Sequence, residues 1–141
     1  NPEIFERLKA SGNSLGNHTY NHLNGWKNST SEYLKQFEKC EELLSTNLFR
    51  PPYGKLKKAP SRVIRKTHNI IMWDIISYDF DTDTTPEQCF GYVKKHVRPG
   101  SIIVFHDSKK AWPNLKKALP KALEHLKKEG YKMEAIPNLY P

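Results

Sequence analysis

The stretch Ile70-Ile71-Met72-Trp73-Asp74-Ile75-Ile76 is the strongest indication of fold class in this chain of 141 residues. Its apolar residues follow one another almost without interruption, whereas a strand with one face in water alternates apolar and polar residues. Such runs are typical of strands covered on both faces. Residues 101–105, Ser-Ile-Ile-Val-Phe, form a second run of this kind. Both segments therefore predict buried strands of a parallel sheet.

Segments with helical periodicity or helix-capping residues lie between the predicted strands. We expect helices at about residues 1–10, 29–46, 60–68, 84–97 and 113–129, with capping boxes at Ser29-x-x-Glu32 and Thr84-x-x-Glu87. Pro120 should kink or interrupt the last helix. Further short strands are expected at residues 14–16, 48–49 and 131–136. Helices and strands therefore alternate, which predicts an α/β fold with parallel strands.

Composition and charge indicate one globular domain with a basic surface. Apolar residues make up 37% of the chain, which is a low share but not a disordered composition. The formal net charge is +8, and many lysines stand in pairs separated by apolar positions at helical spacing. This pattern is typical of solvated helix faces, with attraction to nucleic acid or to an acidic cell-envelope polymer as the alternative. No apolar run is long enough to span a bilayer, so we expect no transmembrane segment in this chain.

Several potentially reactive side chains are predicted to be structural. Cys40 and Cys89 are too few for a disulfide framework and form no Cys-x-x-Cys pair, and each falls in a helical apolar stripe. We expect both to be buried thiols on helix faces. His68, His96 and His125 lie within predicted helices. The chain contains neither a Gly-x-Ser-x-Gly nucleophile turn nor a glycine-rich phosphate loop.

Two histidines lie four positions apart in the turn-rich stretch Gly16-Asn17-His18-Thr19-Tyr20-Asn21-His22. The spacing suits one helical turn or a tight loop that converges on a single ion, and neutral imidazole is a good zinc ligand. Thr19 stands where the helix of zinc proteases has the glutamate that acts as base. From the spacing alone, His18 and His22 are either a metal site or two surface loop histidines.

Three further polar groups follow predicted strands. His106 ends the strand at 101–105 and could act as a general acid or base, while Asp79 could orient that imidazole and stabilise its charged form. Arg50 lies on a rigid turn, Arg50-Pro51-Pro52-Tyr53-Gly54, from which it could hold a carboxylate. The plainer alternatives are a strand-end histidine bonded to backbone and a surface arginine. These groups are candidates because α/β folds build sites at the carboxyl ends of strands.

Taken in order, these segments resemble the polysaccharide deacetylases, the NodB-like carbohydrate esterases of family 4. In that family a His-Thr/Ser segment that ends in a second histidine follows Gly-Asn. An Arg-x-Pro-Tyr segment, an Asp-Trp segment and a strand ending in histidine come next. The matching segments here are His18-Thr19-Tyr20-Asn21-His22, Arg50-Pro51-Pro52-Tyr53, Asp79-Phe80 and Val104-Phe105-His106. The ordered set covers essentially the whole chain.

The resemblance implies a distorted (β/α) barrel that removes N-acetyl groups from N-acetylglucosamine units. It implies that His18 and His22 hold zinc or another divalent transition metal, which polarises the acetamide carbonyl. By the same resemblance, the partner is an N-acetylglucosamine-containing glycan such as peptidoglycan or a chitin-like polymer. The implied location is extracytoplasmic or in the cell envelope.

The resemblance also implies roles for the remaining candidates. His106 would protonate the departing amine, and Asp79 would keep that imidazole charged and oriented. The Tyr53 backbone N–H would help to hold the oxyanion, and Arg50 would steady the catalytic base. The residues implied for the apolar pocket around the acetyl methyl are Trp73, Phe80 and Val104. Two of these, Phe80 and Val104, stand where the family more often has Trp and Leu, which alters the shape of the pocket.

The family's first motif, Thr-Phe-Asp-Asp, has no counterpart in this sequence. That motif supplies the catalytic base and a third metal ligand, and no aspartate precedes Asp74 here. We therefore expect residues 1–141 to be the C-terminal major part of a single deacetylase domain that lacks its first strands and is inactive alone. The alternatives are a catalytically incompetent carbohydrate-binding relative and a basic nucleic-acid-binding domain. The lack of a basic helix with interleaved aromatics argues against a nucleic-acid partner.

Overall fold

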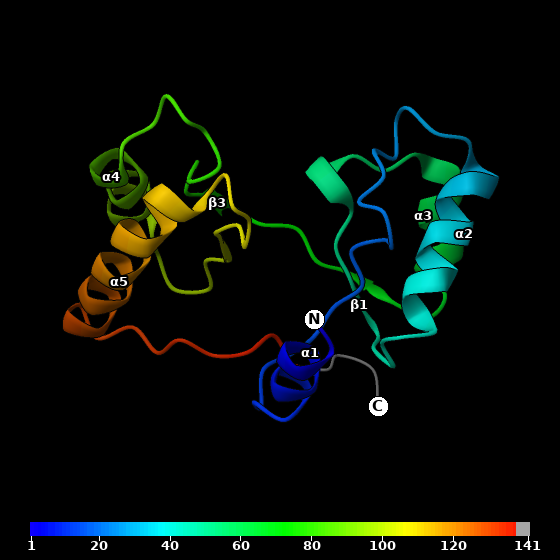
Figure 1. Ribbon diagram of the computed structural model, residues 1–141, viewed down its shortest axis with the longest axis horizontal. Helices are drawn as coiled ribbons and strands as arrows, with labels where there is room; N and C mark the ends of the chain where they lie inside the picture. Colours follow the sequence, from blue (N-terminus) through cyan, green and yellow to red (C-terminus); the bar gives the residue numbers. More distant parts are fainter. Residues whose placement is uncertain (138–141) are drawn as a thin grey trace. The chain divides into compact units, whose positions relative to one another are not determined.

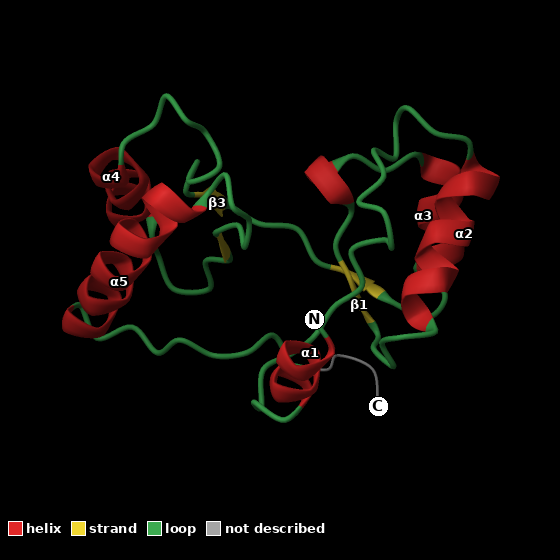
Figure 2. Cartoon of the chain, viewed as in Figure 1, coloured by secondary structure: helices red, strands yellow, loops and turns green. Residues whose placement is uncertain are grey.

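The structure is a computed structural model that describes residues 1–137. It divides the chain into two compact units, one formed by residues 1–72 together with the segment that begins at Ala135, the other by Trp73–Glu134. Figures 1 and 2 show the helices and strands of each unit. Unit 1 contains α1 (Pro2–Lys9), α2 (Thr30–Glu41), β1 (Leu48–Phe49), the 3₁₀ turn η1 (Pro52–Gly54), α3 (Lys58–Ile64) and β2 (Asn69–Ile70). Unit 2 contains β3 (Ile75–Ile76), α4 (Pro86–His96), β4 (Ile103–Val104) and α5 (Trp112–Lys128).

Unit 1 is built on the parallel pair of β1 and β2, in which Leu48 lies opposite Asn69 and Phe49 opposite Ile70. On the other side of β1, Asn17 forms a single parallel bridge to Phe49. The strand predicted at residues 14–16 is therefore reduced to one bridge just beyond it. This bridge brings the segment that carries His18 beside the end of β1.

The core of unit 1 forms where aromatic residues of α2 meet β1. Tyr33 and Phe37 lie one helical turn apart on α2, and both contact the fully buried Phe49 ring edge to face. Ile64 of α3 completes this buried cluster. The Ser29 side chain caps the start of α2 by accepting a hydrogen bond from Glu32 N. The first turns of the helix therefore carry Tyr33 and Phe37 on the face that meets β1.

Unit 2 is built on the parallel pair of β3 and β4, with Ile75 opposite Ile103 and Ile76 opposite Val104. α4 and α5 pack on each other, and small residues of α5 such as Ala118 and Ala122 are fully buried. Residues Ile75, Val93 and Ala122 form the buried cluster between the strands and these helices. The parallel α/β class is confirmed, whereas the closed barrel stays a prediction, because the strands described in residues 1–137 form two separate two-stranded sheets.

The predicted strand at residues 70–76 is wrong as one strand. Ile71 N donates to Phe49 O in unit 1, whereas Ile75 N donates to Ile102 O in unit 2, so the run is divided between two sheets. Asp74 lies at the point where the run divides. Its carboxylate accepts hydrogen bonds from Ile102 N and Ser101 Oγ, both in the segment that leads into β4. Burial acts against the charged form of Asp74. The two hydrogen bonds and the nearby Arg98 guanidinium nevertheless lower its pKa overall.

Several predicted elements also need correction, among them the helix predicted at residues 60–68, which is α3 at Lys58–Ile64. α2 ends at Glu41 rather than near Thr46, because the Thr46 hydroxyl is used outside the helix, where it donates to Leu15 O and accepts from Leu48 N. α4 is capped by Thr85, which forms the capping box with Gln88, rather than by the predicted Thr84 and Glu87. Residues 131–136 form no strand.

Proline 120 does not interrupt α5, which runs from Trp112 to Lys128. Its ring lies on the exposed side of the helix, where water can hydrate the carbonyl that loses its backbone donor. The end of this helix is as predicted, since Gly130 adopts a φ of 80°. Of the two predicted buried thiols, Cys89 is fully buried and Cys40 only partly so. Within residues 1–137 no helix is both long and apolar enough to cross a bilayer.

Candidate functional site

The His18 and His22 rings lie together in unit 1, with centroids 4.9 Å apart in an edge-to-face arrangement. The segment between them is not helical. Thr19 and His22 have φ values of 59° and 53°, in the left-handed region that L-residues seldom adopt. These two backbone turns fold the segment tightly, which brings the imidazoles together at four-residue spacing.

His18 is oriented by the chain that follows β1. Its Nδ1 lies 2.6 Å from Arg50 O. A carbonyl oxygen only accepts, so this hydrogen bond places the imidazole proton on Nδ1 and the lone pair on Nε2. A metal-binding histidine is usually fixed in this way by a backbone carbonyl or a carboxylate. His18 and His22 therefore fit two ligand positions of a divalent transition metal.

Two protein ligands are fewer than zinc usually takes. Across residues 1–137 no three or more His, Cys, Asp and Glu side chains are grouped to hold an ion. Within the described residues, the pair is therefore a candidate for part of a metal site, and its metal role stays a prediction.

The turn after β1 contains two prolines, which restrict its backbone. Pro51 is extended, Tyr53 has a φ of 59°, and Gly54 N donates to Pro51 O. The Tyr53 ring lies with its centroid 4.7 Å from that of His22. Arg50, which precedes the prolines, donates from Nε to Ile71 O, and burial lowers the pKa of its guanidinium. The turn therefore places Tyr53 beside the histidine pair, while the predicted roles of Arg50 and Tyr53 stay predictions.

In unit 2, Asp79 and His106 form a hydrogen-bonded pair. His106 Nδ1 lies 2.7 Å from Asp79 Oδ1, and the His106 backbone N–H donates to Oδ2 at 2.8 Å. The Asp79 side chain is fully buried, whereas that of His106 is 36% exposed. Because the carboxylate accepts at Nδ1, the imidazole presents Nε2 as the nitrogen that can exchange a proton. This geometry suits a histidine that acts as a general acid.

The residues predicted for the acetyl pocket also lie in unit 2. The Phe80 ring packs edge to face on His106, with centroids 4.7 Å apart. Val104 is in β4, and its carbonyl accepts from Ser77 N. Trp73 is partly buried at the start of the unit. Phe80 is therefore in contact with a catalytic candidate.

Two supporting residues escape the motif-based predictions. Ser77 Oγ donates to Asp79 Oδ1 at 2.9 Å, and Asn114 in the first turn of α5 holds the backbone that follows Asp79. The Asn114 side chain donates to the carbonyls of Asp79, Asp81 and Thr84 at 3.2, 3.1 and 2.9 Å. A signal for Asn114 does exist in the sequence, because it falls four residues before Ala118 on the buried face of the helix.

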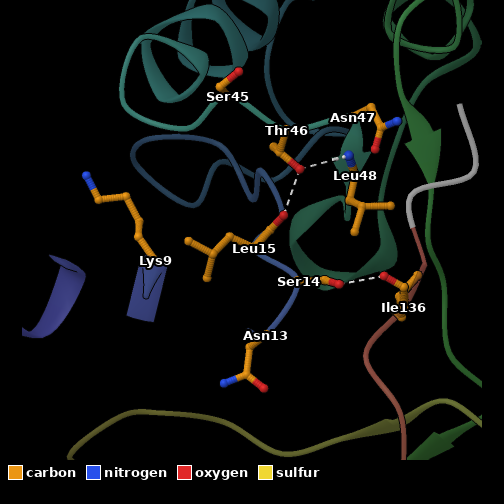
Figure 3. Close-up of a pocket in the computed structure, with 9 residues that line it drawn as sticks. All are labelled: Lys9, Asn13, Ser14, Leu15, Ser45, Thr46, Asn47, Leu48 and Ile136. Atoms are coloured by element: carbon orange, nitrogen blue, oxygen red, sulfur yellow. Dashed lines mark hydrogen bonds between the residues drawn. The ribbon is translucent and has the colours of Figure 1, made fainter. Parts of the chain in front are cut away.

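A pocket of about 350 Å³ lies elsewhere in unit 1, around the beginning of β1 (Figure 3). Ser14 Oγ donates to Ile136 O there, and Thr46 bridges Leu15 O and Leu48 N. The residues that line it are Lys9, Asn13, Ser14, Leu15, Ser45, Thr46, Asn47, Leu48 and Ile136. None of the predicted site residues is among them.

Comparison with known proteins connects this geometry with one family. Residues 1–69 match the family model described as polysaccharide deacetylase. Two relatives from Bacillus cereus, both named peptidoglycan-N-acetylglucosamine deacetylase, are 28% and 31% identical over 150 aligned residues, each covering 99% of this chain. The chain spans 53% of the length of the first and 68% of the second.

Solved structures show the same fold. A peptidoglycan N-acetylglucosamine deacetylase in complex with 4-naphthalen-1-yl-N-oxidanyl-benzamide aligns with a TM-score of 0.86 and 27% identity, over 99% of this chain and 68% of its own. A family 4 pseudoenzyme from Bacillus anthracis aligns with a TM-score of 0.80 and 23% identity, over 95% of this chain and 48% of its own. The 31% identity to a relative of which this chain covers 68% agrees with the family model. This chain belongs to the polysaccharide deacetylase family.

Proposed function

We propose that this chain contributes to a metal-dependent hydrolase that removes N-acetyl groups from N-acetylglucosamine units of peptidoglycan or a chitin-like glycan. The observation that carries the proposal is the pair of imidazoles at 4.9 Å, one of them oriented by a backbone carbonyl. The names of the two Bacillus cereus relatives support the glycan and the acetyl group as substrate. An envelope location follows from such a substrate.

His18 and His22 would hold the metal, which we take to be zinc or another divalent transition metal. When bound, such an ion supplies Lewis acidity toward the acetamide carbonyl. The Arg50 carbonyl keeps His18 in the tautomer that ligation through Nε2 requires. The backbone N–H of Tyr53, whose ring lies beside that of His22, is our candidate donor to the oxyanion.

Proton transfer to the departing amine falls to His106. Its Nδ1 proton is held by Asp79, so the imidazolium form can give up the proton on Nε2 while the carboxylate compensates the charge. Arg50 would hold the carboxylate that acts as catalytic base, which in this family comes from the Thr-Phe-Asp-Asp motif. Phe80, Val104 and Trp73 would exclude water around the acetyl methyl, and Phe80 already packs on the His106 ring.

The test is release of acetate from acetylated chito-oligosaccharide and from peptidoglycan by the full protein, with zinc present and after chelation. We expect zinc-dependent release that His18→Ala abolishes, together with a loss of bound zinc. His106→Gln should lower kcat by about 10²-fold or more while zinc stays bound, because general acid catalysis contributes that much. His96→Ala is the control, since His96 lies exposed at the end of α4. Deacetylation that survives both chelation and His18→Ala would refute the proposal.

A second candidate function is carbohydrate binding without catalysis, because a family 4 pseudoenzyme from Bacillus anthracis shares the fold of this chain. A binding protein of this kind would retain glycan affinity in the same assay and release no acetate at any zinc concentration. Acetate release at enzymatic rates would exclude it.

A further inference from the structure

The loop that carries His18 and His22 has an unfavourable backbone conformation. Thr19 has a φ of 59°, and a β-branched residue in this region is a genuine outlier. His22 has a φ of 53°. Such conformations persist only where the surrounding structure holds them. The residues that hold this loop therefore decide whether the two imidazoles stay together.

Asn17 is the main anchor of the loop. It is fully buried, and its Oδ1 accepts from Thr19 N at 2.9 Å, which stabilises the turn that contains the first outlier. Its Nδ2 donates to Phe37 O at 2.9 Å and to Glu41 Oε1 at 2.6 Å. The loop is thereby tied to the last turns of α2.

Glu41 connects this anchor with a second buried group. Its other oxygen, Oε2, lies 3.1 Å from His68 Nε2. The His68 side chain is only 7% exposed, its Nδ1 lies 2.8 Å from Thr67 Oγ1, and its ring packs edge to face on Phe37. A carboxylate and an imidazole in such a place cost desolvation energy, and the proposed reaction uses neither.

We propose that Asn17, Glu41 and His68 form a positioning network that holds the His18–His22 loop ready to bind metal. This inference rests on the proposed function, and the three residues act through the loop rather than on substrate. Glu41 connects the two other residues, because its Oε1 accepts from Asn17 Nδ2 while its Oε2 lies 3.1 Å from His68 Nε2. Groups that hydrogen-bond a metal ligand directly typically change metal affinity by 10–100-fold when they are removed, and this network acts one step further away, through the backbone of the loop.

The experiment measures zinc affinity of the full protein by competition with a chromophoric chelator, so no turnover is needed. Glu41→Ala should weaken binding about tenfold or more, because Asn17 loses an acceptor and the loop loses its tie. Glu41→Gln should stay within about threefold of the wild type, since its amide oxygen can still accept from Asn17. This rescue separates a hydrogen-bonding role from a general need for charge.

Glu38→Ala is the matched control. Glu38 lies on the same helix and carries the same charge, but it is exposed. It should therefore bind zinc as the wild type does. The absorption spectrum of the cobalt-loaded protein gives a second readout, because it reports the geometry of the ligands. We expect a changed spectrum for Glu41→Ala and an unchanged one for Glu38→Ala.

The outcomes separate the two proposals. A wild type that binds no zinc overturns the proposed metal site and the network with it. A wild type that binds zinc, together with a folded Glu41→Ala variant of equal affinity and spectrum, overturns the network alone. If circular dichroism shows that Glu41→Ala is unfolded, Glu41→Asp decides, because it withdraws the carboxylate by one methylene. Its affinity should fall threefold or more, and an unchanged affinity would overturn the network.

Discussion

Replacing Asn114 by alanine should destabilise unit 2 and loosen the loop that carries Asp79. The Asn114 side chain is buried in the first turn of α5 and donates to three backbone carbonyls between Asp79 and Thr84. Asp79 in turn orients His106 through two hydrogen bonds. A single amide therefore connects the helix to the position of the imidazole.

The size of the effect follows from the hydrogen bonds that the substitution removes. An amide nitrogen has two protons, so three acceptors share two full hydrogen bonds, each worth about 1 kcal/mol net. The carbonyls left without a donor lower the free energy of unfolding further. The higher helix propensity of alanine raises it by about 0.7 kcal/mol. The net loss is about 2 kcal/mol. For a chain of this size, that lowers Tm by about 6 °C.

Thermal unfolding followed by circular dichroism, combined with hydrogen exchange of the amides in residues 79–84, checks this prediction. Exchange in that loop should accelerate more than exchange in β1, which lies in unit 1. Lys116→Ala is the control, because Lys116 is exposed on the same helix and should leave both measurements unchanged. A Tm lowered by less than about 1 °C, with exchange in the loop as slow as in the wild type, would refute the reasoning.

Three other substitutions test local packing and charge. Gly25→Ala should destabilise unit 1 by about 1–3 kcal/mol in urea unfolding, because the new Cβ would collide with the backbone carbonyl of Lys55. Gly91→Ala, with open space around the added Cβ in α4, should instead stabilise by up to about 1 kcal/mol, and equal effects would contradict the packing argument. Asp74→Asn should remove a stabilisation that arises from the lowered pKa of the carboxyl. The wild type should exceed this variant in free energy of unfolding by a constant amount at pH values above the ordinary Asp pKa of about 3.9. This difference should disappear as the pH falls through the lower pKa that Asp74 has in the folded state. A difference that does not change with pH would count against this account.

The sequence predicts individual elements best where local chemistry decides them. α1 begins after Asn1, whose side chain accepts from Ile4 N, and α5 is followed by Gly130 with positive φ. β1 is short, apolar and followed directly by the proline turn. These features depend on neighbours in the chain, so periodicity and capping residues suffice to locate them.

Elements that depend on contacts between distant parts of the chain are not predicted correctly from local sequence. The run from Ile70 to Ile76 looks like one strand, yet its two ends pair with different partners, β1 and β4. Nothing in the run itself reveals which strand each end will join. Thr46 illustrates the same limit, because its periodic position suggests a longer helix while its hydroxyl bonds to Leu15 and Leu48. Tertiary hydrogen bonds override the local preference in both cases.

The candidate site shows a similar division between what motifs reveal and what the fold adds. The order of the motifs points to His18, His22, Asp79 and His106, and the structure brings each pair together within its own unit. Their catalytic roles stay predictions. The residues that hold Asp79 in place have no motif, because Asn114 and Ser77 act through hydrogen bonds that depend on the fold.

Backbone strain gives an independent reason to place function in these segments. In the part of the chain that the structure describes, the non-glycine residues with φ values of 53–59° are Thr19, His22, Tyr53 and Tyr78. The first three lie in the histidine loop or on the proline turn, and Tyr78 directly precedes Asp79. A fold selected only for stability would place glycine or asparagine at such positions, since these residues adopt positive φ at little cost. Backbone strain of this kind is concentrated at functional sites, where the surrounding structure maintains the unfavourable φ and ψ angles. Each strained residue here is, or lies next to, a candidate metal ligand, the candidate oxyanion donor or the carboxylate that orients His106, so the backbone and the motifs point to the same segments by independent physical arguments.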